Sequence, residues 1–327
     1  DAGKVVTTGT QNTLLGGLTG AAITVGGYNV AAGFGALSGD TKGNKNTAIG
    51  WCALETQNFT DGTASNNDSF NTALGYEAGH DVTSGKNNTF VGALCGDDTD
   101  DGAGNTAVGY AALSANCGDG NVAVGSSAGI AITGPSNTVM GNAAGYGITS
   151  GGNNLVLGKD AGRTGSPGGN LTTGDHVISL GDESIGTANI QVDWTVASDA
   201  RDKTDFTALD LGLDFVKDLQ PVTYKWDKRS KYGDKSADDY DLNAQTPDGT
   251  HKEDWLDIGF KAQEVEALEI AAGYDKSSKT NLVSSHTDDG KQMGLQYSKF
   301  VPILVKAIQE QNALIEALTA RIEALEG

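Results

Sequence analysis

The first half of the chain repeats a five-residue unit: Asn, any residue, two small or apolar residues, then Gly. Successive units start at Asn12, Asn29, Asn46, Asn71, Asn88, Asn105, Asn121, Asn137 and Asn154, in steps of 17, 17, 25, 17, 17, 16, 16 and 17 residues. The long step carries an insertion at residues 58–69, and a degenerate tenth copy lies at residues 177–181. A fixed period of this kind predicts a parallel β-solenoid or β-roll with one coil per unit.

Each unit contains one very short strand, such as Thr106-Ala107-Val108, which buries little by itself. Stacking on neighbouring coils turns these strands into a continuous apolar wall. Gly allows the sharp turn after each strand, and stacked Asn side chains can hydrogen-bond along the solenoid. The inward residues are mostly Ala, Val, Leu and Ile, so the coil is thin. A thin coil buries little area, and we expect three chains to associate to complete the core.

The character of the sequence changes after about residue 186, where glycine becomes sparse and charge, aromatics and proline increase. We therefore predict a Gly/Asn-rich β-repeat domain at residues 1–190 and an α/β domain at residues 191–327. Within the second domain, the alternation at residues 222–226 predicts a strand. Helical spacing predicts helices at residues 206–219 and 262–268.

The end of the chain carries a heptad seam and predicts a terminal coiled-coil helix at residues 299–326. The seam consists of Leu304, Ile308, Gln311, Ile315, Leu318, Ile322 and Leu325, in steps that alternate between four and three. Ile and Leu at the two core positions nominally favour a parallel dimer. The thin repeats favour a trimer, and we expect the short coiled coil to follow the domain that it is attached to.

The formal net charge of −20 makes duplex nucleic acid and anionic membranes poor partners. No apolar run is long enough to span a bilayer, and no signal peptide is recognisable. The sequence starts at Asp1 rather than Met, so we expect a piece of a longer polypeptide. Cys52, Cys95 and Cys117 match no metal-site or disulfide spacing, and we expect small buried hydrophobes. The acidic loop at residues 97–102 lacks full calcium-loop spacing, so no metal and no cofactor is expected.

Two resemblances to known families emerge from these motifs. The repeats, such as residues 104–113, resemble the head repeats of trimeric autotransporter adhesins and, more closely, repeats of phage tail fibres. Residues 198–205, Ser-Asp-Ala-Arg-Asp-Lys-Thr-Asp, resemble the start of the endosialidase-type intramolecular chaperone domain. Further pieces follow in the family's order: residues 219–222 with Tyr224 and Trp226, residues 259–265, and Tyr297.

This resemblance implies a C-terminal domain that drives trimerisation of the fibre and then cuts itself off with a Ser–Lys dyad. By position, Ser198 is the nucleophile and Lys203 the base. Cleavage is expected beside Ser198, with Ala197–Ser198 favoured over Ser198–Asp199. Asp202 stands where the family commonly has an apolar residue. A carboxylate there favours the charged form of Lys203 and is expected to slow cleavage.

The residues themselves make this chemistry reasonable. A serine hydroxyl needs an adjacent base, and lysine is a base only when burial or a nearby positive charge, here from Arg201, favours its neutral form. Residues five apart point to different faces of a strand or helix, so Ser198 and Lys203 can meet only across a turn or between chains. From spacing alone, Ser198-Asp199 is better interpreted as a cap and Lys203 as a solvated charge. The family motifs reverse this preference.

We therefore expect a distal segment of a viral tail fibre, assembled in the host cytoplasm and carried on the virion as a parallel homotrimer. Its expected external partner is a host surface receptor, a glycan or an outer-membrane component. The insertion at residues 58–69 and the loop at 97–102 are the expected contact regions. The alternatives are a cellular trimeric surface adhesin and a glycan-degrading tailspike, which requires two carboxylates converging in a cleft.

Overall fold

The computed structural model describes residues 1–59, 67–235, 237, 239–274 and 282–326. The chain forms two compact units. The first contains residues 1–185 together with 233–242, and the second contains residues 186–232 and 243–327. Most of the 58–69 insertion lies outside the described residues.

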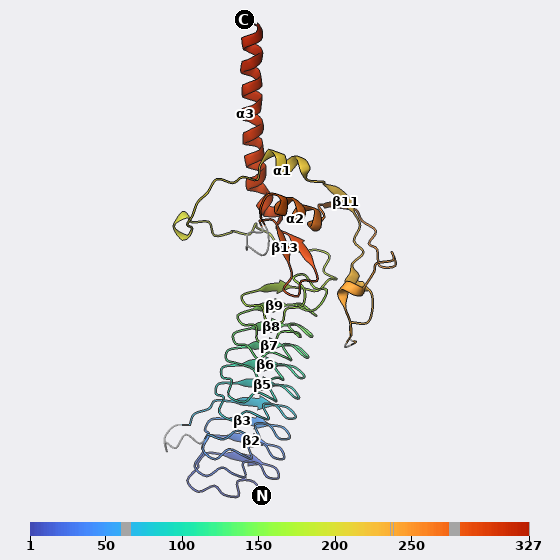
Figure 1. Ribbon diagram of the computed structural model, residues 1–327. Coiled ribbons are helices and arrows are strands. Elements are labelled where there is room, and N and C mark those ends of the chain that lie inside the picture. Colours follow the sequence, from blue (N-terminus) through green and yellow to red (C-terminus); the bar gives the residue numbers. More distant parts are fainter. Residues whose placement is uncertain (60–66, 236, 238, 275–281, 327) are drawn as a thin grey trace. The chain divides into compact units, whose positions relative to one another are not determined.

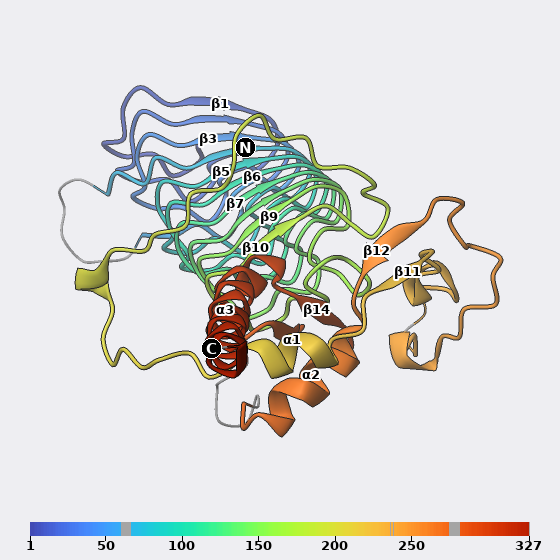
Figure 2. The ribbon, with the colours of Figure 1, turned by 90° about the horizontal axis from the view of Figure 1, so that it is seen from above.

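The first unit is a parallel β-solenoid, as predicted, with one three-residue strand per coil (Figures 1 and 2). The strands are β1 (Thr13–Leu15), β2 (Val30–Ala32), β3 (Thr47–Ile49), β4 (Thr72–Leu74), β5 (Thr89–Val91), β6 (Thr106–Val108), β7 (Val122–Val124), β8 (Thr138–Met140), β9 (Leu155–Leu157) and β10 (Ile178–Leu180). They pair in sequence order, and equivalent residues stand opposite each other, as Ala48 does with Ala73. The degenerate tenth copy is therefore confirmed as the coil that contains β10.

The middle residue of each strand points into the solenoid. In β2 to β9 these residues are Ala31, Ala48, Ala73, Phe90, Ala107, Ala123, Val139 and Val156, and each has no exposed surface. Because most are small, the two walls of the coil lie close together, and the interior is filled by short aliphatic side chains. The three cysteines are free and buried in this unit, as expected.

The predicted asparagine ladder is confirmed. The Oδ1 atom of each coil's Asn accepts a hydrogen bond from the backbone N–H at the same position of the next coil, at 2.8–3.1 Å. The last of these bonds joins Asn154 to Val177, which replaces Asn in the tenth coil. Each of these Asn side chains is thus hydrogen-bonded although it is buried, and the same bond fixes the register between coils.

Glycine after each strand is required by close approach of the coils. Gly50 has φ of +145°, and a Cβ atom there would lie 1.9 Å from the carbonyl oxygen of Gly75. No L side chain fits this backbone or this space, and the closing glycines from Gly16 to Gly141 all approach the next coil's backbone in the same way.

The second unit is mixed α/β. Its helices are α1 (Leu213–Asp218), α2 (Ala262–Ala271) and α3 (Phe300–Glu326), and its strands form two antiparallel pairs, β11 (Val222–Tyr224) with β12 (Asp257–Gly259) and β13 (Ser284–His286) with β14 (Met293–Leu295). Short 3-10 helices are η1 (Ala200–Asp202), η2 (Arg229–Lys231) and η5 (Tyr297–Lys299), while η3 (Leu242–Ala244) lies at the boundary between units. The core gathers around Phe215, Val265, Val283, Phe300 and Ile303.

The helix predicted at residues 206–219 is wrong for residues 206–212. Asp205 has φ of +54°, Phe206 is exposed, and Gly212 stands at the N-cap of α1, so the helix begins only at Leu213. The predicted strand at 222–226 is confirmed over β11, and the helix at 262–268 is confirmed and continues to Ala271.

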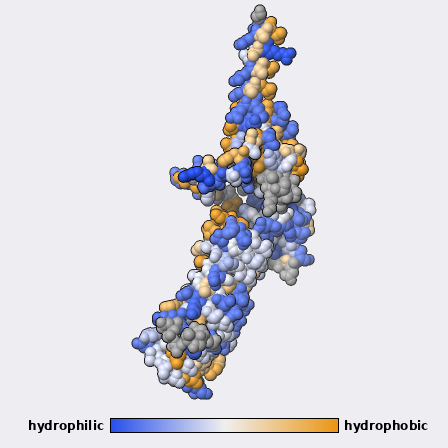
Figure 3. Space-filling view, turned by 60° about the vertical axis from the view of Figure 1, so that its left-hand side comes forward, coloured by the Kyte–Doolittle hydropathy of each residue, from blue (hydrophilic) through white to orange (hydrophobic). Residues whose placement is uncertain are grey.

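The terminal helix is confirmed as α3, whose first turns bury Phe300, Ile303 and Ala307. Its heptad residues lie on the surface: Ile308, Ile315, Leu318 and Ile322 are each more than half exposed. Figure 3 shows hydrophobic surface, in orange, alternating with hydrophilic surface along this helix. The coiled coil itself remains a prediction.

In the described part of the chain, none of the helices combines the length and the apolar character needed to cross a membrane. Over the same residues, no cluster of three His, Cys, Asp or Glu side chains is arranged to hold a metal ion.

Candidate self-cleavage site

The site predicted at Ser198 is a single tight turn. Asp199 is the N-cap of η1, and its carboxylate accepts the backbone N–H of Arg201 at 2.9 Å. Lys203 follows the helix in an extended conformation, and its N–H donates to the carbonyl of Ala200. This turn reverses the chain between Ser198 and Lys203. Asp199 therefore caps the helix within the same turn that allows Ser198 and Lys203 to meet, and the two interpretations are compatible.

The turn brings the two dyad residues together. Lys203 Nζ donates a hydrogen bond to Ser198 Oγ at 2.6 Å. Of the two possibilities left open by the spacing, this contact lies across a turn within one chain. For catalysis the direction of the bond must reverse, because a base accepts the hydroxyl proton and only the neutral amine can do so.

Arg201 is paired with Asp199. Its guanidinium group makes three contacts of 2.6–3.2 Å with that carboxylate. These hydrogen bonds lower the pKa of Asp199 and raise the pKa of Arg201, so both groups stay charged. The positive charge expected beside Lys203 is therefore balanced locally. Asp202 forms no hydrogen bond or ion pair with Lys203 among the described side chains.

The site is open to solvent, because every residue from 184 to 208 is exposed. Directly upstream, Ile190, Val192, Trp194 and Val196 alternate with polar residues and are 53–78% exposed. Within the described residues, the backbone of 187–198 makes no hydrogen bond with other backbone groups. This segment has the pattern of a half-buried strand without a partner strand.

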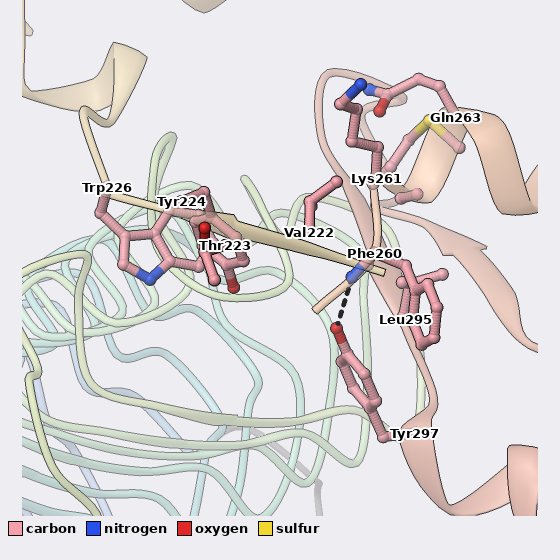
Figure 4. A pocket seen from close by; sticks show the side chains of 12 residues that line it. Val222, Thr223, Tyr224, Trp226, Phe260, Lys261, Gln263, Leu295 and Tyr297 are labelled. Carbon is pink, nitrogen blue, oxygen red and sulfur yellow. Dashed lines mark hydrogen bonds between the residues drawn. The ribbon is translucent and has the colours of Figure 1, made fainter. Parts of the chain in front are cut away.

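Three of the motif pieces meet at one pocket elsewhere in the second unit. Tyr224 and Trp226 lie on one side and Phe260 and Leu295 on the other (Figure 4). The hydroxyl of Tyr297 accepts the backbone N–H of Phe260 at 3.3 Å. The pocket encloses about 470 Å³ and is mainly apolar. The order of the motif pieces along the sequence does not indicate which of them touch. The pocket was therefore not predictable from that order.

Sequence reasoning missed Glu269, whose side chain is almost fully buried. Its carboxylate accepts the backbone N–H groups of Leu282 at 2.9 Å, Val283 at 2.5 Å and Ser284 at 3.0 Å, and also the Ser284 hydroxyl. A buried carboxylate held by this many donors joins α2 to the start of β13. The available signal was an acidic residue within the apolar helix pattern after residue 262.

Comparison with known families agrees with the motif reading. Residues 198–274 match the family described as chaperone of endosialidase, and the match begins at Ser198. Three of the four motif pieces lie inside it, while Tyr297 and α3 lie beyond it. No curated protein matches the chain, and no solved structure does. The region at residues 198–274 is therefore similar to the chaperone of endosialidase family.

Proposed function

We propose that the chain is the distal segment of a viral tail fibre, whose C-terminal domain assembles three chains and then cuts itself off beside Ser198. A β-solenoid joined to a chaperone of endosialidase domain supports a tail fibre or tailspike type of protein. The observation that carries the cleavage proposal is the 2.6 Å contact between Lys203 Nζ and Ser198 Oγ.

Trimerisation is supported by surfaces that a single chain leaves uncovered. The heptad residues of α3 are exposed, and the upstream segment at 190–196 has an exposed apolar edge. Apolar surface of this extent on several elements favours association. In this proposal the chaperone domain brings the chains together, and the solenoid is the fibre that it assembles.

The cleavage reaction proceeds by acyl transfer. Ser198 Oγ attacks the carbonyl carbon of Ala197 while Lys203 Nζ takes the hydroxyl proton. The C–N bond to Ser198 then breaks, the nitrogen receives the proton from Lys203, and Ala197 is held as an ester on Ser198 Oγ. Water hydrolyses the ester, which leaves a carboxylate on Ala197 and a free amino group and hydroxyl on Ser198.

Assembly would complete this site. Only the neutral form of a lysine can accept the hydroxyl proton, and exclusion of water favours that form. Covering the apolar edge at 190–196 by neighbouring chains would also bury the adjacent turn at 198–203. Cleavage would then report that three chains have assembled correctly.

Host attachment is proposed for the loops of the solenoid. The described loop at residues 97–102 is acidic, and the insertion at 58–69 interrupts the regular coil spacing. Loops on a rigid scaffold commonly carry recognition. A receptor on the host surface, a glycan or an outer-membrane component, is the proposed partner, and the virion is the proposed location.

The test is incubation of the full chain at neutral and raised pH, followed by denaturing gel electrophoresis, intact mass and N-terminal sequencing. We expect fragments of about 20 and about 14 kDa, the smaller starting at Ser198. Ser198→Ala and Lys203→Met should stay whole but still assemble, whereas Ser184→Ala and Lys225→Met serve as matched controls that cut normally.

Asp202→Leu restores the apolar residue that the family commonly has at this position, and we expect it to cut faster than the wild type. If the wild type and Asp202→Leu both remain whole at pH values where lysine is largely neutral, the cleavage proposal is wrong. The chaperone role would then stand without it.

A further inference from the structure

The outward face of the solenoid sheet carries an unbroken apolar column. It consists of the third residue of each strand: Leu15, Ala32, Ile49, Leu74, Val91, Val108, Val124, Met140, Leu157 and Leu180. None of these ten residues is polar. Leu15 is 71% exposed, Leu74 46% and Met140 44%, so the column lies on the surface of the chain.

The first residue of each strand stands two positions before the third, so its side chain points to the same outward face. These positions hold Thr in β1, β3, β4, β5, β6 and β8, and Val, Leu or Ile in β2, β7, β9 and β10. The two columns thus contain no charged residue, although the chain has a net charge of −20. A sheet face exposed to water in a chain this acidic normally carries charges.

Aromatic side chains extend the apolar surface beside the column. Phe34 stacks on Trp51 with ring centroids 6.5 Å apart, and Trp51 stacks on Tyr76 at 5.0 Å, with interplanar angles of 13° and 8°. The rings therefore face one another from coil to coil, and both faces of the central Trp51 ring are covered by its neighbours. A ring that is stacked on both faces has none left on which a sugar could lie, which favours a protein surface as the partner.

We infer that this face packs against the same face of two further copies of the chain, parallel and in register around a threefold axis. The inference rests on the proposed trimeric assembly and specifies its surface. A column with one side chain per coil requires a partner with the same spacing over the same length. Another copy of this solenoid has that spacing in every coil.

The available area is sufficient. Nine inter-strand steps of about 4.8 Å make the column about 43 Å long, and two columns about 7 Å apart cover a strip roughly 15 Å wide. This gives roughly 600 Å² per chain, close to the ~800 Å² per partner of a stable interface. The absence of charge on the strip also allows three acidic chains to approach without like-charge repulsion at the contact.

The test is cysteine accessibility in the full chain, with the mass of the assembly measured on the same sample. Met140→Cys places a thiol in the apolar column of β8, and Ser150→Cys places one at an exposed position of the same coil outside the strand. The native cysteines give a low background, since all three are buried and burial raises the pKa of Cys95 to about 12.

We expect a maleimide–polyethylene glycol reagent to modify Met140→Cys at least tenfold more slowly in the native trimer than in urea. Ser150→Cys should react at similar rates in both, and mild oxidation should join two chains only in Met140→Cys. A native trimer in which both variants react equally fast overturns this interface while leaving the proposed function intact. A folded single chain refutes the proposed assembly as well. If Met140→Cys does not fold, Val108→Cys provides the same measurement two coils away.

Discussion

The asparagine that starts each coil shows how one residue type sets the geometry of the solenoid. Its Oδ1 atom accepts an N–H from the next coil, and in seven of the nine described copies Nδ2 also donates to a glycine carbonyl. The ladder along the coils was predictable from the repeat. The glycine partner was not, because it depends on the return path of the same coil.

Two neighbouring asparagines provide a matched test of this arrangement. Asn88 accepts from Asn105 N–H and donates to Gly102, both at 2.8 Å, whereas the buried Nδ2 of Asn105 has no hydrogen-bond partner among the described residues. Asn88→Ala leaves two buried backbone groups unpaired and should cost about 2–5 kcal/mol, against about 1–3 kcal/mol for Asn105→Ala. Thermal unfolding should show the larger loss for Asn88→Ala. Equal losses would contradict the role given to Nδ2.

The spacing between Ser198 and Lys203 limits where the two side chains can meet but does not select one place. Five residues separate Ser198 from Lys203, which restricts their contact to a turn or a neighbouring chain. The choice of the turn depends on η1, and η1 depends on the Asp199 cap. The pairing of Arg201 with Asp199 is a side-chain preference that a residue pattern does not encode.

Helices and strands that follow a regular sequence period were predicted correctly, whereas local backbone conformation was not. The strands of the solenoid, α2 and α3 follow directly from periods of about 17 and 3.5 residues. The prediction for residues 206–212 failed, because apolar spacing takes no account of Asp205 in a left-handed conformation or of Gly212 at the helix start. The apolar pocket depends on contacts between distant segments, which no period reports.

The start of α1 depends on a residue from α3. Gly212 has no side chain to cap the helix, and Glu310 instead accepts the Leu213 N–H at 2.7 Å and pairs with Lys306 at 3.1 Å. These contacts lower the pKa of Glu310 below its ordinary value of 4.5. The stabilisation is therefore present above pH 4.5 and is lost as the pH falls through the lowered folded-state pKa.

Glu310→Gln should lower the melting temperature of the C-terminal domain at pH 7. It should also flatten the fall in melting temperature below pH 4.5, since the group that titrates has been removed. Glu316→Gln, on an exposed part of the same helix, is the control and should behave as the wild type. An unchanged melting temperature and pH profile for Glu310→Gln would show that this cap does not stabilise the domain.

For the whole molecule, the chain keeps apolar surface where association would cover it. The column on the solenoid sheet, the segment at 190–196 and the seam of α3 lie at three stages along the sequence. The sequence predicted the seam from its heptads and the association from the thin coil. It did not predict that the column is exposed, because an apolar third residue looks the same in the sequence whether it faces the interior or the surface.

The most direct test of the central claim is the native mass of protein refolded from denatured chains. The full chain carrying Ser198→Ala, in which the proposed cut is blocked, should refold to three times its 33.5 kDa mass. Residues 1–197 alone should yield little trimer, because the proposed assembling domain is missing. A folded single chain from the first sample, or efficient trimer formation by the second, would contradict a fibre assembled by its own C-terminal chaperone.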